Sequence, residues 1–432
     1  MRAVVVGAGL AGLAATCALA DQGWDVALVE RGRLLGGKAT SFSVDGVEVD
    51  NGQHVHLQCC TEYLDFVDAL GMSDSLWTQP RFEVTVLRRG APPSSLRTAH
   101  GLPPSLSLLP SFARYRPLGW AAKLQVARGL RAATADPEAT ETFGSWLRRH
   151  GQGRAAIEGF WELFVVPAVN ASIDEVSAAD ALFVIRTALA ADPDAARIGW
   201  SRVPLARIAE AAAERAGAVH LRTGVVSLLD DGETVRGVRC ADGQEIGADA
   251  VVLAVPHSRL AAILGDPARY GVHGLDQFQT RAIVDVHLWF DSASGPSGFA
   301  AVVGSPVQWV FEKQPGYLCC SLSAADTLVG RPEAELVALC HAELVAVWPR
   351  LASARLLRGA ATRDPEATFV PTVGLRRPGA ATTRPNLVLA GAWTATGWPA
   401  TMESAVRSGR AAARTLAVTA HVKPRELETV GG

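Results

Sequence analysis

The chain has 432 residues, of which 49% are hydrophobic and 19% are charged, and its formal net charge is −2. These values indicate a folded chain with one large core or two smaller ones, and they give no electrostatic case for nucleic acid binding. The seven cysteines form no CxxC pair. We therefore expect reduced thiols in a cytoplasmic protein with no metal site. The sequence contains no run of about 18 apolar residues that would predict a membrane-spanning helix.

The N-terminus carries a nucleotide-binding fingerprint. An apolar run from residue 3 leads into GAGLAG, and a predicted helix, a second strand and Glu30 follow. Such glycines permit a tight turn, a close approach to a pyrophosphate and close helix–strand packing, while the helix N-terminus attracts phosphate. Glu30 stands where an acid accepts hydrogen bonds from a ribose. The residues predicted to bind a dinucleotide here are Gly7, Gly9, Leu10, Ala11, Gly12 and Glu30.

The residues after Glu30 indicate which dinucleotide is bound. Arg31 is followed by Gly36, Gly37 and Lys38, and two glycines with a cation suit a second backbone approach to a pyrophosphate. This stretch resembles the GG-R/K motif of FAD proteins with glutathione-reductase-like and amine-oxidase-like folds. We therefore expect FAD as the cofactor. The alternative is a Gly-rich surface turn with a solvated lysine.

The next elements change in character along the chain. Residues 41–58 predict a hairpin that ends in a polar cluster, 61–71 a short helix, and 82–90 a strand of a different sheet. Residues 103–150 contain several prolines and predict a helical insertion. This insertion is either an ordinary amphipathic segment with a solvated basic face or a segment lying on an anionic membrane. Its basic residues are Arg114, Arg116, Lys123, Arg128 and Arg131.

The second half of the chain returns to the nucleotide-binding pattern. Residues 202–222 predict a helix, and three strands with Asp-Gly turns then lead to a buried parallel strand in ADAVVLAVP. Residues 281–323 alternate like an antiparallel sheet, 333–349 predict a helix, and a strand and long helix follow from 386. We predict an α/β fold with a Rossmann-type, glutathione-reductase-like FAD-binding domain formed by 1–80, 202–260 and 380–420. An inserted mixed sheet and helical substrate domain would comprise 81–201 and 261–379.

The strand and helix near the C-terminus predict the second wall of the flavin site. The strand ends at Gly391 and Ala392, and the helix that opens near Thr401 and Met402 would direct its N-terminal dipole at the flavin ring. The backbone near Val226 is expected to meet the adenine. Alternatively, the final strand and helix only close the core.

Three longer motifs resemble one family over nearly the whole chain. They are DNGQH at 50–54, GFWELFVVPAVNASIDEVSA at 159–178 and LAGAWTATGWPATMESAVRSGRAAA at 389–413. The chain resembles the hydroxysqualene dehydroxylases, a squalene-associated, FAD-dependent branch of the phytoene-desaturase and amine-oxidase superfamily. The resemblance implies removal of the hydroxyl of hydroxysqualene to give squalene, using reduced FAD, in hopanoid or related triterpene biosynthesis. The family tends to have Asp where this chain has Ala392.

Other activities remain open. A desaturase or amine-oxidase-like oxidase of the same superfamily would reverse the electron flow, and an isoprenoid-binding protein would have lost catalysis. The electron donor is not indicated. A hydrocarbon substrate suits a cytoplasmic protein that lies peripherally on the inner face of the cell membrane.

The implied reaction needs a hydride donor, an acid and a dry apolar tunnel. Polar residues within apolar runs are the candidate acids, and His54 is preferred over Glu162 and Glu403. Gly52, Gln53 and His54 follow the hairpin that the fingerprint would bring near the flavin. Residues expected to line the substrate path are Trp161, Asn170 and Trp398. For each of these residues, a structural role in the core is the alternative.

Overall fold

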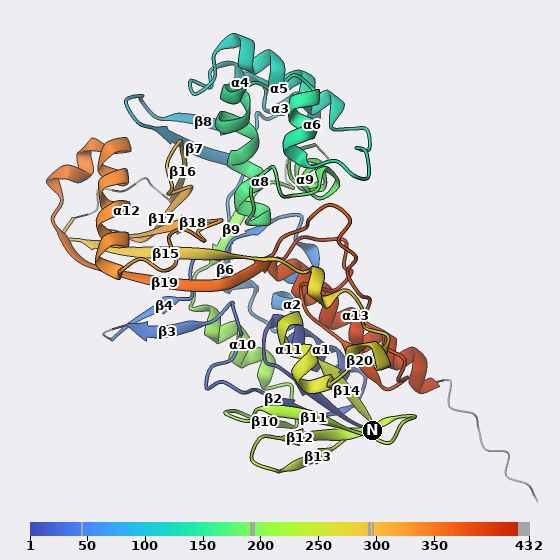
Figure 1. Cartoon of the computed structure of the whole chain (residues 1–432). Helices are drawn as coiled ribbons and strands as arrows, with labels where there is room; N and C mark the ends of the chain where they lie inside the picture. The colour runs from blue at the N-terminus through green and yellow to red at the C-terminus, as the bar shows by residue number, and fades with distance from the viewer. Residues whose placement is uncertain (45, 191–194, 293–294, 296–297, 422–432) are drawn as a thin grey trace, which may run out of the picture.

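The computed structural model describes residues 1–432 except 45, 191–194, 293–294, 296–297 and 422–432. A parallel sheet in the order β10-β2-β1-β14-β20 forms the centre of the nucleotide-binding half (Figure 1). Its strands come from three segments that lie far apart in the sequence. They are β1 (Arg2–Val6), β2 (Asp25–Val29), β10 (Ala218–His220), β14 (Ala250–Leu253) and β20 (Leu387–Leu389).

Helices and a small sheet cover the two faces of this parallel sheet. On one face, α1 (Leu10–Asp21) packs between α10 (Leu205–Ala213) and α13 (Met402–His421), and α2 (Thr61–Ala69) packs on α13. The other face is covered by α11 and a three-stranded antiparallel sheet. Their bounds are β11 (Val225–Asp230), β12 (Val235–Cys240), β13 (Glu245–Gly247) and α11 (His257–Leu264).

The second large sheet has seven strands in the order β19-β15-β18-β17-β16-β7-β8. Its strands pair antiparallel except for β16 and β7, so the sheet is mixed, as predicted. Helix α12 (Glu333–Val347) covers one face, which carries the even-numbered apolar residues of β15. The strands are β7 (Glu83–Arg88), β8 (Ser94–Arg97), β15 (Thr280–Phe290), β16 (Phe299–Val303), β17 (Trp309–Gln314), β18 (Tyr317–Leu322) and β19 (Leu356–Phe369).

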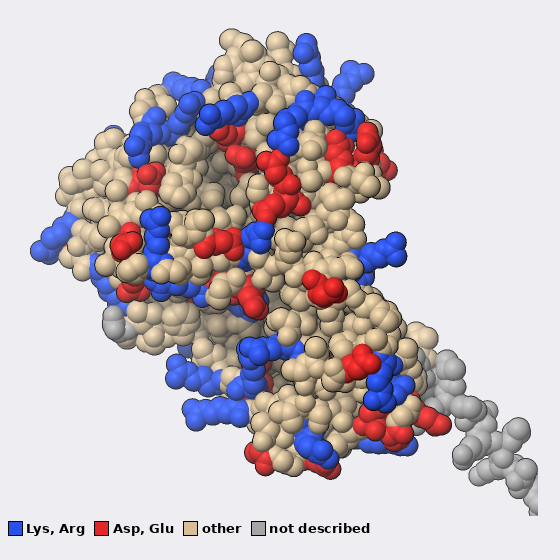
Figure 2. All heavy atoms as spheres, viewed as in Figure 1, with Lys and Arg blue, Asp and Glu red and all other residues tan. Residues whose placement is uncertain are grey.

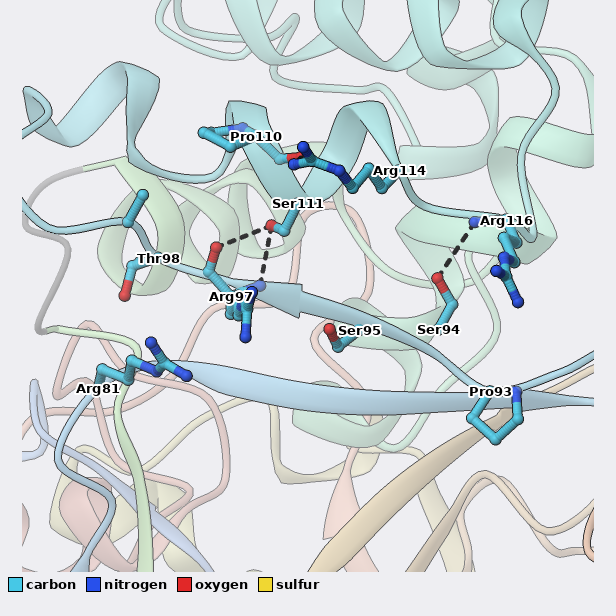
Figure 3. Close-up of a pocket in the computed structure, with 11 residues that line it drawn as sticks. Arg81, Pro93, Ser94, Ser95, Arg97, Thr98, Pro110, Ser111, Arg114 and Arg116 are labelled. Carbon is cyan, nitrogen blue, oxygen red and sulfur yellow. Dashed lines mark hydrogen bonds between the residues drawn. The ribbon is translucent and has the colours of Figure 1, made fainter.

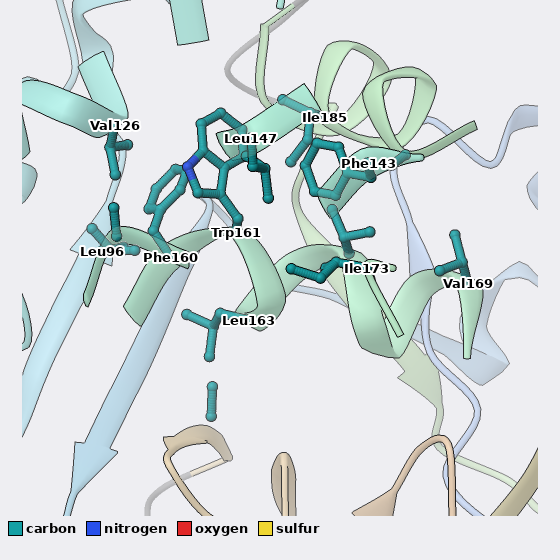
Figure 4. Packing of buried hydrophobic residues seen from close by; sticks show 14 of the residues in the cluster. Leu96, Val126, Phe143, Leu147, Phe160, Trp161, Leu163, Val169, Ile173 and Ile185 are labelled. Atoms are coloured by element: carbon teal, nitrogen blue, oxygen red, sulfur yellow. The ribbon is translucent and has the colours of Figure 1, made fainter. Parts of the chain in front are cut away.

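A helical region lies beyond β7 and β8, at the top of Figure 1. Its core is an aromatic cluster that includes Phe143, Phe160 and Trp161 (Figure 4). The helices are α3 (Pro104–Ser107), α4 (Leu109–Ala113), α5 (Trp120–Ala132), α6 (Phe143–Arg149), α7 (Arg154–Ala156), α8 (Glu162–Val169) and α9 (Ala178–Ile185), with π-helical turns at Ile157–Trp161 and Arg186–Ala190.

Short elements connect the two halves. A hairpin of β3 (Ser41–Val44) and β4 (Val47–Asp50) precedes a small sheet of β5 (His56–Leu57), β9 (Ile198–Ser201) and β6 (Leu76–Thr78). Single 3₁₀ turns occur at Ser73–Ser75, Pro267–Tyr270, Leu275–Gln277 and Pro349–Ser353. None of the helices in the described ranges is long and apolar enough to cross a membrane.

Two of the differences from the sequence prediction have a clear physical reason. The helix expected over 202–222 ends at Ala213, and residues 218–220 instead form the edge strand β10. Gly217 lies between the helix and β10, and the chain can pass close to β2 there because glycine has no side chain. A Cβ at this position would lie 2.4 Å from Asp25 Oδ1. Strand β19 was not predicted, because its polar, Pro-containing sequence lacks a clear alternation. It occupies the edge of its sheet, where proline is tolerated.

Candidate functional site

The fingerprint turn and the second glycine pair lie against each other. The amide of Gly36 donates to Ala8 O at 2.8 Å, and a Cβ on Gly37 would lie 2.9 Å from Gly9 Cα. A Cβ on Gly12 would lie 1.9 Å from Gly7 O, so only glycine permits this helix–strand contact. Leu10 and Ala11 open α1 directly above the turn. The two backbone segments therefore form one cradle of the kind that accepts a pyrophosphate.

Glu30 lies at the end of this cradle. Its carboxylate accepts hydrogen bonds from the amides of Ala8 at 2.8 Å and Gly32 at 2.7 Å. Thr223 N donates to Glu30 O at 2.9 Å, which brings the start of β11 beside Glu30 and Arg31. Val226 is exposed on that strand. These positions are compatible with the predicted ribose and adenine contacts, which remain predictions.

Loop 51–54 continues the cradle toward the seven-stranded sheet. Asn51 N donates to Thr40 O at 2.8 Å, and Asn51 Nδ2 donates to Lys38 O at 3.2 Å. The Lys38 ammonium itself donates to Asp364 Oδ2 on β19 at 2.9 Å. His54 Nε2 lies 3.1 Å from Asn51 O. The loop therefore joins the second glycine pair to the substrate half of the molecule.

Asp285 of β15 meets this loop from the other side. Gln53 N donates to Asp285 Oδ1 at 3.3 Å, and a Cβ on Gly52 would lie only 2.3 Å from Asp285 Oδ2. Asp285 is 5% exposed, and burial raises its pKa to about 6, although Ser321, Gln53 N–H and Lys313 act to lower that pKa. The carboxyl group therefore keeps a proton at higher pH than an ordinary aspartate does.

The sheet face around Asp285 changes from polar to aromatic along two rows of paired residues. One row runs through Thr362, Asp285, Ser321, Trp309 and Ala301. The next runs through Ala360, His287, Cys319, Phe311 and Phe299. Trp200 from β9 packs edge-on against Phe299 and Phe311. Asp285 is therefore a buried carboxyl group at the border of a broad apolar, aromatic surface.

The loop after β20 forms the other wall and is held by a half-buried arginine. The Arg377 guanidinium donates to Ala392 O at 2.8 Å, Trp393 O at 3.2 Å and Trp398 O at 2.6 Å. Thr401 Oγ1 accepts from Ser404 N at 3.2 Å, which caps the start of α13. Gly391 N donates to Ser408 Oγ at 2.9 Å. This loop and the N-terminus of α13, where Met402 is the first residue, are thus fixed in place.

Comparison with known proteins identifies the family. The family model described as flavin containing amine oxidoreductase matches residues 10–417. The chain belongs to this family. A hydroxysqualene dehydroxylase from Sinorhizobium fredii is 28% identical over 95% of this chain and 96% of its own length. A 15-cis-phytoene desaturase from Synechococcus elongatus is 25% identical over 96% of each.

Solved structures give the same fold. A putrescine oxidase triple mutant from a redesign of cofactor binding has a TM-score of 0.76 at 18% identity, covering 96% of this chain and 98% of that chain. A putative protoporphyrinogen oxidase from an Exiguobacterium species has a TM-score of 0.70 at 19% identity, covering 97% and 99%. The protein is an FAD-dependent oxidoreductase of the amine oxidoreductase fold, as its sequence predicts.

Three buried polar atoms support the fit of a flavin in this amine oxidoreductase. Gln53 Oε1, His287 Nε2 and Trp309 Nε1 have no hydrogen-bond partner within the described ranges. Together with the glycine cradle, they suit a large polar ligand that runs from Glu30 past Gly52. The described residues include no group of three or more His, Cys, Asp or Glu side chains placed to hold a metal ion.

Two of the three predicted acids, Glu403 and Glu162, have their contacts outside loop 51–54. The Glu403 carboxylate accepts from Glu62 N at 3.2 Å and Tyr63 N at 2.8 Å, at the start of α2, and from Arg407 Nε at 2.6 Å. It caps a helix and ties α13 to α2, and these contacts favour the structural alternative over the predicted role as an acid. Glu162 is half-buried beside the exposed Glu158 and Asp174, and desolvation raises its pKa. No contact joins Glu162 to loop 51–54.

His54 does lie in the loop, but its chemistry differs from the expectation. Burial lowers the pKa of its imidazole below the usual 6.5. The ring is therefore neutral at neutral pH and is a poor proton donor to a leaving hydroxyl. Asp285 is the stronger acid candidate, and its only sequence signal is a single carboxyl residue in the apolar run AIVDVHLWF.

Two predicted lining residues are structural. Trp161 is fully buried among aromatic rings, and its Nε1 donates to Gln152 Oε1 at 2.8 Å (Figure 4). Asn170 ends α8 in a left-handed conformation, and its amide group bonds Arg281 O and Thr368 Oγ1 at 3.0 Å and Ala324 N at 2.6 Å. These contacts favour the structural role that was the alternative for both residues, and their substrate contact stays a prediction. Trp398 is half-buried and packs against Phe183 beside the loop after β20.

Proposed function

We propose that this oxidoreductase removes the hydroxyl group of hydroxysqualene to give squalene, as a step of hopanoid or related triterpene biosynthesis. The carrying observation is the buried carboxyl group of Asp285 between loop 51–54 and an aromatic sheet face. A hydrocarbon with one hydroxyl group needs this combination, because its only demanding polar step is protonation of the leaving oxygen. The full-length similarity to hydroxysqualene dehydroxylases supports the same substrate.

Reduced FAD, when bound, supplies the hydride that replaces the hydroxyl group. Asp285 is protonated in a larger fraction of molecules than an ordinary aspartate at the same pH, and the protonated form gives its proton to the hydroxyl oxygen as the C–O bond breaks. The alcohol, one hydride and one proton thus become the hydrocarbon and one water. Phe299 and Phe311 offer ring faces that stabilise positive charge on the carbon during bond breaking. Their apolar surface also excludes water from that carbon.

The main alternative is a desaturase or an amine-oxidase-like oxidase, in which electrons flow from the substrate to FAD. The similarity to phytoene desaturases supports that alternative at lower identity. Oxidation has no leaving hydroxyl to protonate, so Asp285 would have no task there. A protein that only binds isoprenoids would need neither FAD nor Asp285.

The test is product analysis with FAD-loaded protein and hydroxysqualene in detergent. We expect squalene under anaerobic conditions with dithionite as reductant, and a rate at least about a hundredfold lower for Asp285→Asn at equal FAD content. Absence of squalene from the wild-type protein would refute the proposal. Reduction of the oxidised flavin by phytoene or by an amine would support the oxidase alternatives, and failure to take up FAD would support the binding protein.

We also propose that the enzyme works in the cytoplasm at the inner face of the cell membrane, where a hydrocarbon substrate dissolves. Fractionation of cells that express the tagged protein tests this location. Release of the protein from membranes by high salt is the expected result, and recovery entirely in the soluble fraction at low salt would contradict it.

A further inference from the structure

A segment with many Lys and Arg residues and no acidic residue forms much of the end of the molecule farthest from the parallel sheet. Residues 84–135 contain eight Lys or Arg and no Asp or Glu, although the whole chain has a net charge of −2. The segment forms β7 after its first residue, Glu83, and all of β8, α3, α4 and α5. Figure 2 shows Lys and Arg atoms on both sides of an uncharged tip at this end. Such separation of charge creates a local positive field that attracts anions.

Four arginines from this region and its border line one groove of about 560 Å³ between β8 and α4. Figure 3 shows their side chains around it, together with Ser94, Ser95, Thr98 and Ser111. Ser111 Oγ fixes the groove by donating to Arg97 O at 2.7 Å and accepting from Arg97 N at 3.0 Å. The arginines are Arg81, Arg97, Arg114 and Arg116.

Most of these charges are uncompensated. Arg81 pairs with Glu83 at 2.7 Å. Across the described ranges, by contrast, no ion pair engages the guanidinium groups of Arg97, Arg114 and Arg116. Arginines and hydroxyl groups around one groove match the oxygens of a phosphate group. Lys123 is not part of this surface, because it is buried and its ammonium donates to Ala113 O at 2.7 Å.

Large apolar side chains project from the same segment. Leu109 is 57%, Trp120 71% and Leu124 59% exposed. Trp120, Leu124, Arg128 and Arg131 have the spacing that places them on one outer face of α5, while Ala122 and Val126 face the core. Exposed apolar side chains that cluster in one segment indicate an interaction site, and their mixture with arginines suits a lipid interface.

We propose that this surface, formed by β8 and α3–α5, docks on a bilayer with anionic headgroups, with a headgroup phosphate in the groove lined by Arg97, Arg114 and Arg116. A soluble anion would explain the arginines but leave Leu109, Trp120 and Leu124 in water. An acidic protein as the partner would place no phosphate group in the groove. The inference rests on the proposed membrane location, but not on the identity of the substrate.

Vesicle co-sedimentation of the FAD-loaded protein tests the proposal. The vesicles are phosphatidylcholine with or without phosphatidylglycerol. We expect stronger binding to the anionic vesicles, which weakens as salt is raised. Each arginine near an anionic surface contributes about a fivefold change in partitioning, so the triple variant Arg97→Gln, Arg114→Gln, Arg116→Gln should bind about a hundredfold more weakly.

Two further variants separate charge from apolar contact. The charge-matched control Arg2→Gln, Arg259→Gln, Arg269→Gln changes exposed arginines of the nucleotide-binding half and should bind like the wild type. Leu109→Ser with Trp120→Ser should weaken binding to both kinds of vesicle. Equal thermal stability and FAD content of all variants show that each has folded.

Several results would overturn the proposal. The first is equal binding of the protein to both kinds of vesicle. The second is an equal loss of vesicle binding in the control variant and the groove variant. The third is displacement of the protein from vesicles by inorganic phosphate at a matched concentration of phosphorus. Binding to polyglutamate without binding to vesicles would instead indicate an acidic protein partner. Squalene formation is assayed separately in detergent, so failure of the proposed reaction leaves the vesicle result interpretable.

Discussion

The ammonium group of Lys313 lies 3.2 Å from Asp50 Oδ2, and the two residues are 263 positions apart in the chain. Lys313 belongs to β17 of the seven-stranded sheet, and Asp50 ends the hairpin that leads into loop 51–54. Their side chains are only 17% and 10% exposed. Asp50 Oδ1 also accepts from Ser41 Oγ and Leu205 N. The pair therefore fixes the hairpin against the substrate half at the position where Asp285 meets Gly52.

Removing Lys313 leaves a largely buried carboxylate without its cation. We expect Lys313→Met to lower the free energy of unfolding by about 3 kcal/mol. Urea denaturation measures this change. Arg239→Gln breaks an exposed pair with Glu245 and should cost only about 0–1 kcal/mol. Similar losses of unfolding free energy in the two variants would show that the Lys313–Asp50 pair stabilises the protein no more than an exposed ion pair does.

Asp285 makes stability depend on pH in a defined direction. Its folded-state pKa of about 6 lies above the ~3.9 of an unfolded aspartate. Between these values the folded chain holds a proton that the unfolded chain has released, so its contribution to stability is full below about pH 4 and is lost as pH rises through about 6. Asp285→Asn removes this titration. We expect the variant to exceed the wild type by about 2–3 kcal/mol at pH 7 and to match it near pH 4.

Urea unfolding at the two pH values measures that difference. The charged or titratable groups around Asp285 are Lys313 on β17, Asp50 on β4, His287 on its own strand and Cys319 on β18. The neutral polar groups are Ser321 on β18, Thr362 on β19 and the loop amide of Gln53. A stability difference that is the same at both pH values would show that the carboxyl group titrates normally.

Gly52 has no room for a side chain. Its φ is +90°, and an added Cβ would lie 2.3 Å from Asp285 Oδ2. We expect Gly52→Ala to destabilise the protein by about 3 kcal/mol or more and to lower its FAD content, since loop 51–54 must move. Gly71→Ala is the matched control, because φ is +70° there and a Cβ would meet nothing within 4 Å. It should cost about 1 kcal/mol and leave FAD content unchanged. Flavin absorbance per mole of protein provides the second measurement.

Glu403 should affect stability and not the chemical step. In Glu403→Gln one carboxylate oxygen becomes an amide that cannot accept from Glu62 N or Tyr63 N. We expect a loss of about 1–2 kcal/mol in unfolding free energy. The rate of squalene formation per FAD-loaded molecule should equal that of the wild type. A large loss of rate at unchanged stability would restore Glu403 as a candidate acid.

The sequence predicted the cofactor half well because its signals are local. A glycine fingerprint and Glu30 at fixed spacing depend on backbone geometry within one βαβ unit, and the structure brings Gly9, Gly37 and Glu30 together. The candidate acid was harder to find. Asp285 acquires its environment from Gly52 and Ser321, which belong to distant segments. Its chemistry therefore arises from tertiary contacts that no local pattern records.

Tertiary contacts also explain why three predicted site residues have structural roles in the fold. Trp161 and Asn170 stand in a conspicuous motif, but their polar atoms are occupied by Gln152 and by the backbone at Arg281 and Ala324. Glu403 opens a helix, yet it caps a different one. A conspicuous residue in a sequence motif can thus mark a contact between two chain segments as well as a substrate site.

The packing of α13 on α1 has a consequence for synthesis of the protein. These helices are nearly the last and the first elements of the chain, and a Cβ on Gly409 would lie 2.1 Å from Ala11 O. As the ribosome makes the chain, α1 and the edge of β14 lack these neighbours until the segments that form β20 and α13 have emerged. The nucleotide-binding half therefore starts to form before the substrate half and is completed after it. Truncated chains consequently display an open sheet edge and an apolar helix face, which marks them for chaperones or proteases.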